Sequence, residues 1–185
     1  MSSEPLLKTP LPSFGSLAAM TAVCHTITYF LMGILAYHFL HCADIMGKPG
    51  SGMRAMSDPL IIAGPMLQPL RGILFASVFY PFRERLFSRR HGWLLMGWML
   101  IALGILGTFA APPGSMEGLI YTTVPVWIQL RGYLEIVPQA LLLSAFLCYW
   151  VNNPGKKWVT WLLGIVFCLT MVLPVLGLLT RGMQR

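Results

Sequence analysis

Arg71 is a charged residue within a largely apolar stretch of the chain that runs from Leu60 to Tyr80. An ionisable side chain at bilayer depth costs about 2.5–3.5 kcal/mol on insertion scales, so it normally faces a partner or a water-filled cavity. A carboxylate is the least costly partner, and Glu135 is the carboxylate that lies in the middle of another apolar stretch. We therefore predict that Arg71 and Glu135 face one another inside the protein.

Other polar side chains are placed to complete a cluster with this pair. They lie three or four residues apart within their own apolar stretches, and this spacing places them on one face of a helix. The full predicted cluster is Gln68 and Arg71 from one stretch, Arg131, Glu135 and Gln139 from a second, and His25 and Tyr29 from a third.

This cluster has two interpretations. A carboxylate beside histidine and tyrosine in a low-dielectric environment has a movable pKa, which suits a pathway for a solute or for protons. A buried ion pair can also fix the register of the helices and have no other role. The first interpretation predicts a cavity that water can reach, whereas the second predicts a sealed interior. The number of polar groups favours the first.

A second group of side chains has the chemistry of a soft-metal site. Thioether, thiolate and imidazole groups suit Cu(I). They gather at the end of the first apolar stretch and in the loop after it: His38, His41, Cys42, Met46, Met53 and Met56. The signal is weak because the chain has 12 methionines. Haem would need histidines on facing helices, whereas three of the 4 histidines share one stretch, so we expect no metal and no cofactor.

The composition identifies the elements that must position these residues. Of the 185 residues, 56% are apolar and 10% are charged, and the mean hydropathy is +0.70. A soluble domain has about 25% charged residues. The sequence therefore predicts an all-α integral membrane bundle whose surroundings are membrane lipids.

Five apolar stretches are long enough to cross a bilayer, because each crossing takes about 20 residues. The predicted spans are residues 17–42, 60–80, 92–110, 121–151 and 158–179, within a five-helix domain of residues 17–181. Residues 1–16 form a cytoplasmic lead-in and residues 182–185 a tail. Pro65 and Pro69 predict a broken entry to the second span. Gly97, Gly104 and Gly107 predict close helix packing in the third.

The basic residues predict the orientation of the bundle. Five spans put seven of them on the side of the N-terminus, namely Lys8, Arg83, Arg85, Arg89, Arg90, Lys156 and Lys157, and four on the other side, namely Lys48, Arg54, Arg181 and Arg185. Basic loops remain in the cytoplasm, so the N-terminus is inside and the C-terminus outside. This pattern explains the net charge of +7 without nucleic acid as a partner.

An offset of 60 residues aligns parts of the chain with one another. It places Pro65, Leu70, Arg71 and Gly72 on Pro125, Leu130, Arg131 and Gly132. A true duplication would be a parallel repeat of a helical hairpin, spans 2–3 on spans 4–5, as in some transporters. Helices rich in leucine and glycine also match by chance, and the same offset aligns a basic loop with an apolar segment. Both explanations stay open.

Four short motifs occur along the chain: the His25, Tyr29, Gly33 spacing, LQPLRG at Leu67–Gly72, GSMEGLIY at Gly114–Tyr121, and the Glu135, Gln139 pair. Together they resemble an uncharacterised family of bacterial multi-pass inner-membrane proteins. The resemblance implies a location in the bacterial cytoplasmic membrane and implies no activity. It also implies that Glu117 and Tyr121 accompany the cluster at its outer mouth.

Two functions of different classes fit these observations. The first is a small permease-like or ligand-binding membrane protein, in which the cluster contacts a small anionic or protonatable solute. The second is a non-catalytic accessory subunit that packs in a homo-oligomer or in a larger membrane complex. An enzyme acting on a lipid would need the cavity to open sideways into the bilayer, and the sequence favours a protein that is not an enzyme.

Overall fold

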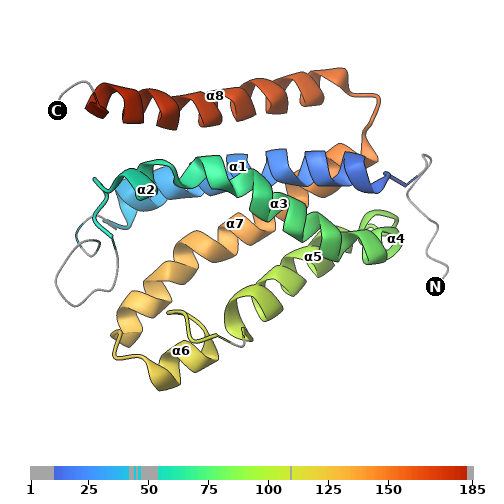
Figure 1. The fold of residues 1–185 in the computed structure, drawn as a ribbon. Coiled ribbons are helices and arrows are strands. Elements are labelled where there is room, and N and C mark those ends of the chain that lie inside the picture. The colour runs from blue at the N-terminus through green and yellow to red at the C-terminus, as the bar shows by residue number, and fades with distance from the viewer. Residues whose placement is uncertain (1–10, 42–43, 45, 47–53, 109, 183–185) are drawn as a thin grey trace.

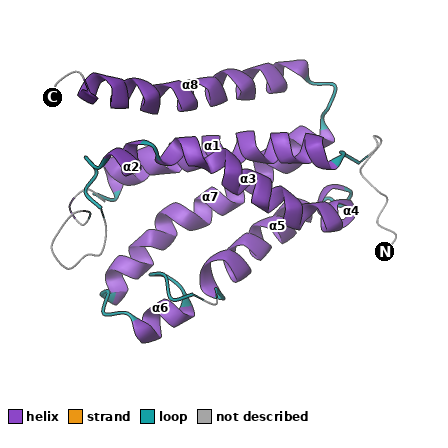
Figure 2. Cartoon of the chain, in the orientation of Figure 1, coloured by secondary structure: helices purple, strands orange, loops and turns teal. Residues whose placement is uncertain are grey.

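The computed structural model describes residues 11–41, 44, 46, 54–108 and 110–182 (Figure 1). Within these residues every regular element is a helix (Figure 2). The elements are α1 (Phe14–Phe39), α2 (Pro59–Ile62), α3 (Gly64–Phe79), the 3-10 helix η2 (Tyr80–Phe82), α4 (Arg83–Phe87), α5 (Gly92–Ile101), the π-helix η3 (Ala102–Leu106), α6 (Met116–Tyr121), α7 (Val126–Asn152) and α8 (Lys157–Gly182).

Three helices in the described part of the chain are long and apolar enough to cross a membrane: α1, α7 and α8. The predicted second span falls into α2 and α3, and the predicted third span is a shorter apolar helix from Gly92 to Leu106. The all-helical class is confirmed, and three helices of this length and apolarity fit a membrane protein. Helix length alone does not establish five spans.

α1 is the central helix of the bundle, in contact with α3, α7 and α8 (Figure 1). Its buried face carries threonines, which would be costly in an apolar core if their hydroxyl groups lacked partners. Thr21, Thr26 and Thr28 donate to backbone carbonyls four residues earlier, over 2.7–2.9 Å. The backbone of α1 thus accepts the hydrogen bonds of these hydroxyl groups, and the threonine side chains can pack against neighbouring helices.

The backbones of α1 and α3 come into close contact at Gly72. A Cβ atom at this position would lie 2.4 Å from Cα of Ala22 and 2.9 Å from its nitrogen. The buried residues of α3, namely Gln68, Gly72, Ala76 and Phe79, follow a spacing of three or four and face the rest of the bundle. The glycine of the LQPLRG motif is therefore the crossing point of the two helices.

α5 packs against α7 through one of the three glycines predicted for this role. A Cβ on Gly97 would meet Leu141 Cδ2 at 2.9 Å, whereas Gly104 has open space around it. A Cβ on Gly107 would meet only the backbone of Ala102, the acceptor of its own hydrogen bond across the π-helix. The expected glycine packing is confirmed at Gly97 and is wrong at Gly104 and Gly107, because the helix changes to π geometry after Ile101.

The predicted break in the second span lies at Ala63, between α2 and α3, just before Pro65. Pro65 occupies the first turn of α3, where its missing N–H costs nothing, and Pro69 lies inside the helix. Asp58 caps α2: its carboxylate accepts from Leu60 N at 2.8 Å and from Arg54 at 3.0 Å.

These two contacts, the backbone N–H first and the Arg54 guanidinium second, hold the pKa of the exposed Asp58 carboxyl below its usual value of 3.8. A depressed carboxyl pKa stabilises the fold at neutral pH. This contribution is lost as the pH falls below the ordinary carboxyl pKa and through the lowered pKa of the folded protein.

The basic segment after Pro81, predicted as a loop, is partly helical. Chain direction changes through η2, and α4 then buries Leu86 and Phe87 while Arg85 stays exposed. The guanidinium carbon of Arg83 lies 4.0 Å from the centroid of the Tyr80 ring. Two apolar residues in the middle of the basic run therefore anchor it to the bundle and leave most of its arginines at the surface.

The segment between the third and fourth predicted spans is bound to the first turns of α7. Gly114, whose φ is +93°, donates to Gln129 Oε1 at 2.9 Å and accepts from the Tyr133 hydroxyl. Gln129 also donates to Val124 O at 2.9 Å. One side chain of α7 thus holds both the turn before α6 and the link after it.

Positions related by the 60-residue offset have different surroundings. Gly72 is closed against α1, whereas the nearest atom to a Cβ on Gly132 belongs to Ile136 of the same helix, at 4.0 Å. Arg71 is exposed and Arg131 is half-buried. The parallel repeat stays a prediction.

Candidate functional site

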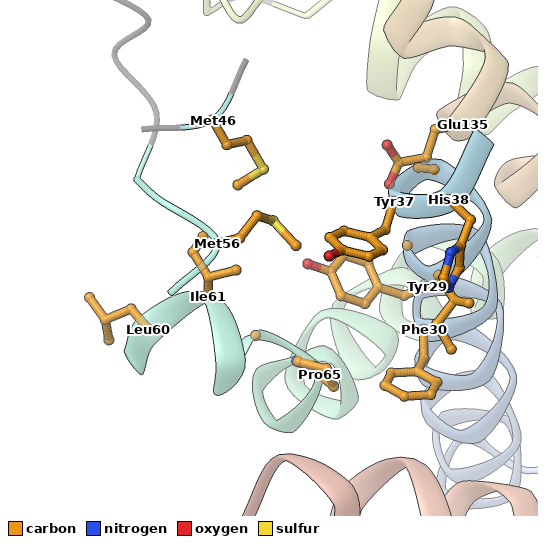
Figure 3. A pocket seen from close by; sticks show the side chains of 14 residues that line it. Tyr29, Phe30, Tyr37, His38, Met46, Met56, Leu60, Ile61, Pro65 and Glu135 are labelled. Atoms are coloured by element: carbon orange, nitrogen blue, oxygen red, sulfur yellow. The ribbon is translucent and has the colours of Figure 1, made fainter. Parts of the chain in front are cut away.

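A cavity of about 490 Å³ lies between the second half of α1, the α2–α3 junction and the middle of α7 (Figure 3). Most of its wall is apolar. Its lining residues are Tyr29, Phe30, Gly33, Ile34, Ala36, Tyr37, His38, Met46, Met56, Leu60, Ile61, Gly64, Pro65 and Glu135.

Polar groups from α1 and α7 meet in this cavity. The hydroxyl groups of Tyr29 and Tyr37 point toward the side where Met46 and Met56 lie, and Glu135 lines the same cavity (Figure 3). The Tyr29 hydroxyl is within electrostatic reach of Glu135. Two hydroxyl groups and one carboxylate therefore face an otherwise apolar space.

The local sequence of α1 explains how the cavity forms. Tyr29, Gly33 and Tyr37 recur every four residues, so they occupy one face of the helix. A Cβ added to Gly33, between the tyrosines, would meet nothing within 4 Å, so this glycine leaves room in the wall. On the opposite wall, a Cβ added to Gly64 would lie 3.4 Å from the Tyr29 hydroxyl oxygen, so the hydroxyl group lies close to the start of α3.

The predicted pairing of Arg71 with Glu135 is wrong. Neither side chain forms an ion pair within the part of the chain that the structure describes, where the salt bridge found joins Arg54 to Asp58. Arg71 is exposed on α3 and its guanidinium carbon lies 5.5 Å from the centroid of the Phe75 ring. The arginine thus stacks on its own helix, and Glu135 faces the cavity.

His25 and Gln68, both in the predicted cluster, do meet. His25 Nε2 lies 3.0 Å from Gln68 Oε1, and Gln68 Nε2 donates to Gly64 O at 3.1 Å. Because the Gly64 carbonyl can only accept, the amide must present its oxygen to the imidazole, and Nε2 of His25 carries the proton. Nδ1 is then an acceptor, and it is buried without a hydrogen-bond partner among the described residues.

Aromatic rings surround the His25 imidazole. Phe75 packs edge-on against it at 5.0 Å, and the Tyr29 ring lies 6.4 Å away on the same helix. Because Tyr29 also lines the cavity, His25 is connected to the cavity wall through one side chain. The structure therefore brings together four predicted residues, in two adjoining sets: His25 with Gln68, and Tyr29 with Glu135.

The remaining predicted residues lie outside the cavity wall. Arg131 and Gln139 are half-buried on α7, one turn on either side of Glu135. Glu117 and Tyr121 belong to α6, and Tyr121 is 75% exposed. Neither Glu117 nor Tyr121 lines the cavity.

Part of the weak soft-metal group also reaches the cavity. His38, Met46 and Met56 line it, whereas His41 is exposed. Cys42 and Met53 lie outside the described residues. Among the described residues no three histidine, cysteine, aspartate or glutamate side chains are close enough to hold a metal ion.

Several wall residues were not predicted. Tyr37 was missed although it continues the spacing of Tyr29 and Gly33, and that spacing could have identified it. Phe30, Leu60, Ile61 and Pro65 are ordinary apolar residues of a membrane helix. Nothing in the type of Phe30, Leu60 or Ile61 marks them as wall residues. Leu60 and Ile61 belong to α2, which the break at Ala63 separates from α3.

No protein-family model, curated protein or solved structure matches this chain. The family suggested by the short motifs therefore stays a prediction.

Proposed function

We propose that this protein is a small permease-like or ligand-binding membrane protein, and that the cavity beside α1 is its solute site. The observation that carries the proposal is the Glu135 carboxylate, which faces the cavity and has no ion pair or hydrogen bond in the described part of the chain. A charged group without a protein partner at bilayer depth is a mark of function, because a purely structural role would leave its cost uncompensated.

The dimensions of the cavity support this proposal. Small-molecule sites have volumes of roughly 300–1,000 Å³, with mainly apolar walls and a few polar groups that converge. The cavity of about 490 Å³, with its two tyrosines and one glutamate, has this composition.

We place the bundle in a bacterial cytoplasmic membrane with five spans, the N-terminus inside and the C-terminus outside. Under this arrangement the C-terminal half of α1 and the N-terminal half of α7 lie in the outer leaflet. The cavity then opens near the outer surface, where the loop after α1 connects to α2.

Thiol labelling of whole cells tests this function. Cys24 and Cys148 are buried and Cys168 is exposed, so the experiment needs a background without native cysteines. We expect Gly33→Cys, in the cavity wall, to react with a charged, membrane-impermeant maleimide added outside the cell. The control is Leu134→Cys, whose parent side chain is 61% exposed beside Glu135 but does not line the cavity.

A maleimide reacts with a thiolate, which a lipid-facing cysteine does not form. Lipid should shield the control position, so its labelling should be at least about tenfold slower. If Gly33→Cys reacts no faster than the control from either side, using inside-out vesicles for the inner side, the cavity is closed to water and the proposed function is wrong.

The alternative, an accessory subunit of a larger membrane complex or a homo-oligomer, is favoured by α8. Only 11% of its apolar 18-residue stretch is buried within the molecule. A groove of about 550 Å³ runs along the helix between Thr160 and Val172. Sedimentation of the protein after extraction in a mild detergent tests this alternative. A protein mass of 20.6 kDa alone would contradict it.

A further inference from the structure

We propose that the cavity binds a protonated amine carried on an apolar body. This inference rests on the proposed function and names the class of solute. It follows from the sign of the charge in the wall, from the aromatic rings beside that charge, and from the apolar character of the remaining surface.

The acidic side chain of the wall is Glu135, which is negative when ionised. Glu135 lines the cavity, and no described lysine or arginine does. Arg71 and Arg131 belong to the predicted cluster, but neither lines the cavity. An anionic solute would meet the carboxylate without a lysine or arginine to compensate, whereas an ammonium group would pair with it. The cavity therefore discriminates by charge in favour of cations.

The groups beside the carboxylate also suit an ammonium ion. The rings of Tyr29 and Tyr37 line the same cavity as Glu135, and the Tyr29 hydroxyl is within electrostatic reach of this carboxyl (Figure 3). Tyrosine faces attract cations, and this attraction is larger where water is excluded. Phenol oxygens can in addition accept N–H hydrogen bonds. An ammonium group placed at this point would have partners on more than one side.

The far wall determines the rest of the solute. Met46 and Met56 lie across the cavity from the tyrosines, and Leu60 and Ile61 continue the same wall (Figure 3). Methionine side chains are flexible and polarizable, so they adapt to apolar groups of different shape. A flat or branched hydrocarbon body attached to the amine would cover this surface.

Three probes with one apolar body and different charge test the inference: phenethylammonium, 2-phenylethanol and phenylacetate. Their dissociation constants are measured by titration calorimetry with the full-length protein in lipid nanodiscs. We expect the ammonium probe to bind about tenfold more tightly than the alcohol, because hydrogen bonds and pairing with a charged group exceed those with a neutral one. Phenylacetate should bind more weakly than either.

Two isosteric variants assign the effect to one carboxylate. Glu135→Gln should remove the preference for the ammonium probe and keep binding of the alcohol, since the shape of the cavity is preserved. Glu117→Gln is the matched control, because Glu117 lies outside the cavity wall, and it should leave all three dissociation constants unchanged.

The outcomes separate the inference from the function on which it rests. Equal binding of the three probes, a preference for phenylacetate, or an ammonium preference that survives Glu135→Gln would overturn the amine inference and leave the solute site intact. Failure of all three probes would also overturn it. The labelling of Gly33→Cys then decides the proposed function independently.

Discussion

At the scale of single residues, His25 is a buried polar side chain that depends on one hydrogen-bond partner. It is 2% exposed, its Nε2–H is donated to Gln68, and its Nδ1 has no partner among the described residues. A buried donor that loses its acceptor costs the full desolvation of that group. Gln68 is therefore the residue whose removal should most affect the stability of the site.

We expect Gln68→Ala to lower the free energy of unfolding by about 1–3 kcal/mol, because it leaves the His25 N–H buried and unpaired. The measurement is an SDS titration of the purified protein in mixed micelles. Gln139→Ala is the control, because this glutamine is half-buried on α7 and lies outside the cavity wall. Equal losses for the two variants would refute a specific role for the His25–Gln68 bond.

Residue types and spacing predicted part of the cluster but not the pairing between helices. Spacing on one helix correctly associated His25 with Tyr29, and both are near the cavity. The partner of Arg71 could not be predicted, because opposite charges on two helices meet only if both helices turn the right faces toward each other. In the structure Arg71 lies on Phe75 of its own helix instead.

At the scale of elements, the contact of α1 with α3 sets the geometry around the site. Only a residue without Cβ fits where Gly72 meets Ala22, since 2.4 Å is far shorter than any Cβ contact. The neighbours at this point are backbone atoms, which cannot rotate away as the end of a side chain can. The two helices must therefore move apart if a methyl group is added.

Gly72→Ala should reduce the free energy of unfolding by about 1–3 kcal/mol, the usual cost of forcing extra volume into a packed interior. Gly132→Ala serves as the control, because its surroundings are open and alanine favours the helix. The same SDS titration measures both. A true structural repeat would make the two substitutions similar, so a large loss at Gly132 would support the duplication and contradict this prediction.

Helix boundaries were predictable where the apolar stretch was long, and less so elsewhere. α7 and α8 agree with the predicted spans to within a few residues at most ends, since lipid demands continuous helix there. The broken entry to the second span was predicted from its prolines but not its exact position at Ala63, and the π-helix after Ile101 was not predicted. Both depend on how the neighbouring turns satisfy their hydrogen bonds, which residue types do not specify.

At the scale of the whole molecule, the number of crossings determines the topology. Length and composition identify three spans, and α3 and α5 with η3 are shorter. A bundle of three spans and one of five both leave the two termini on opposite sides. They differ in the position of the basic segment around α4, which is inside with five spans and outside with three.

We expect an alkaline phosphatase fusion after Arg90 to be inactive in the bacterial cell, because the arginines of this segment hold it in the cytoplasm. A fusion after Gly114 should be active, and it is the control for export of the reporter. Activity of both fusions would show that α3 and α5 do not cross.

The close approach of Gly72 to Ala22 is the point about which α1 can change its angle to α3. Tyr37, at the cavity end, is about 22 Å from Ala22 along the helix at 1.5 Å per residue. At that distance, a change of about 5° in the angle between α1 and α3 displaces Tyr37 by about 2 Å. The width of the cavity is thus controlled by an angle fixed at two of the smallest residues in the protein, well away from any group that touches a solute.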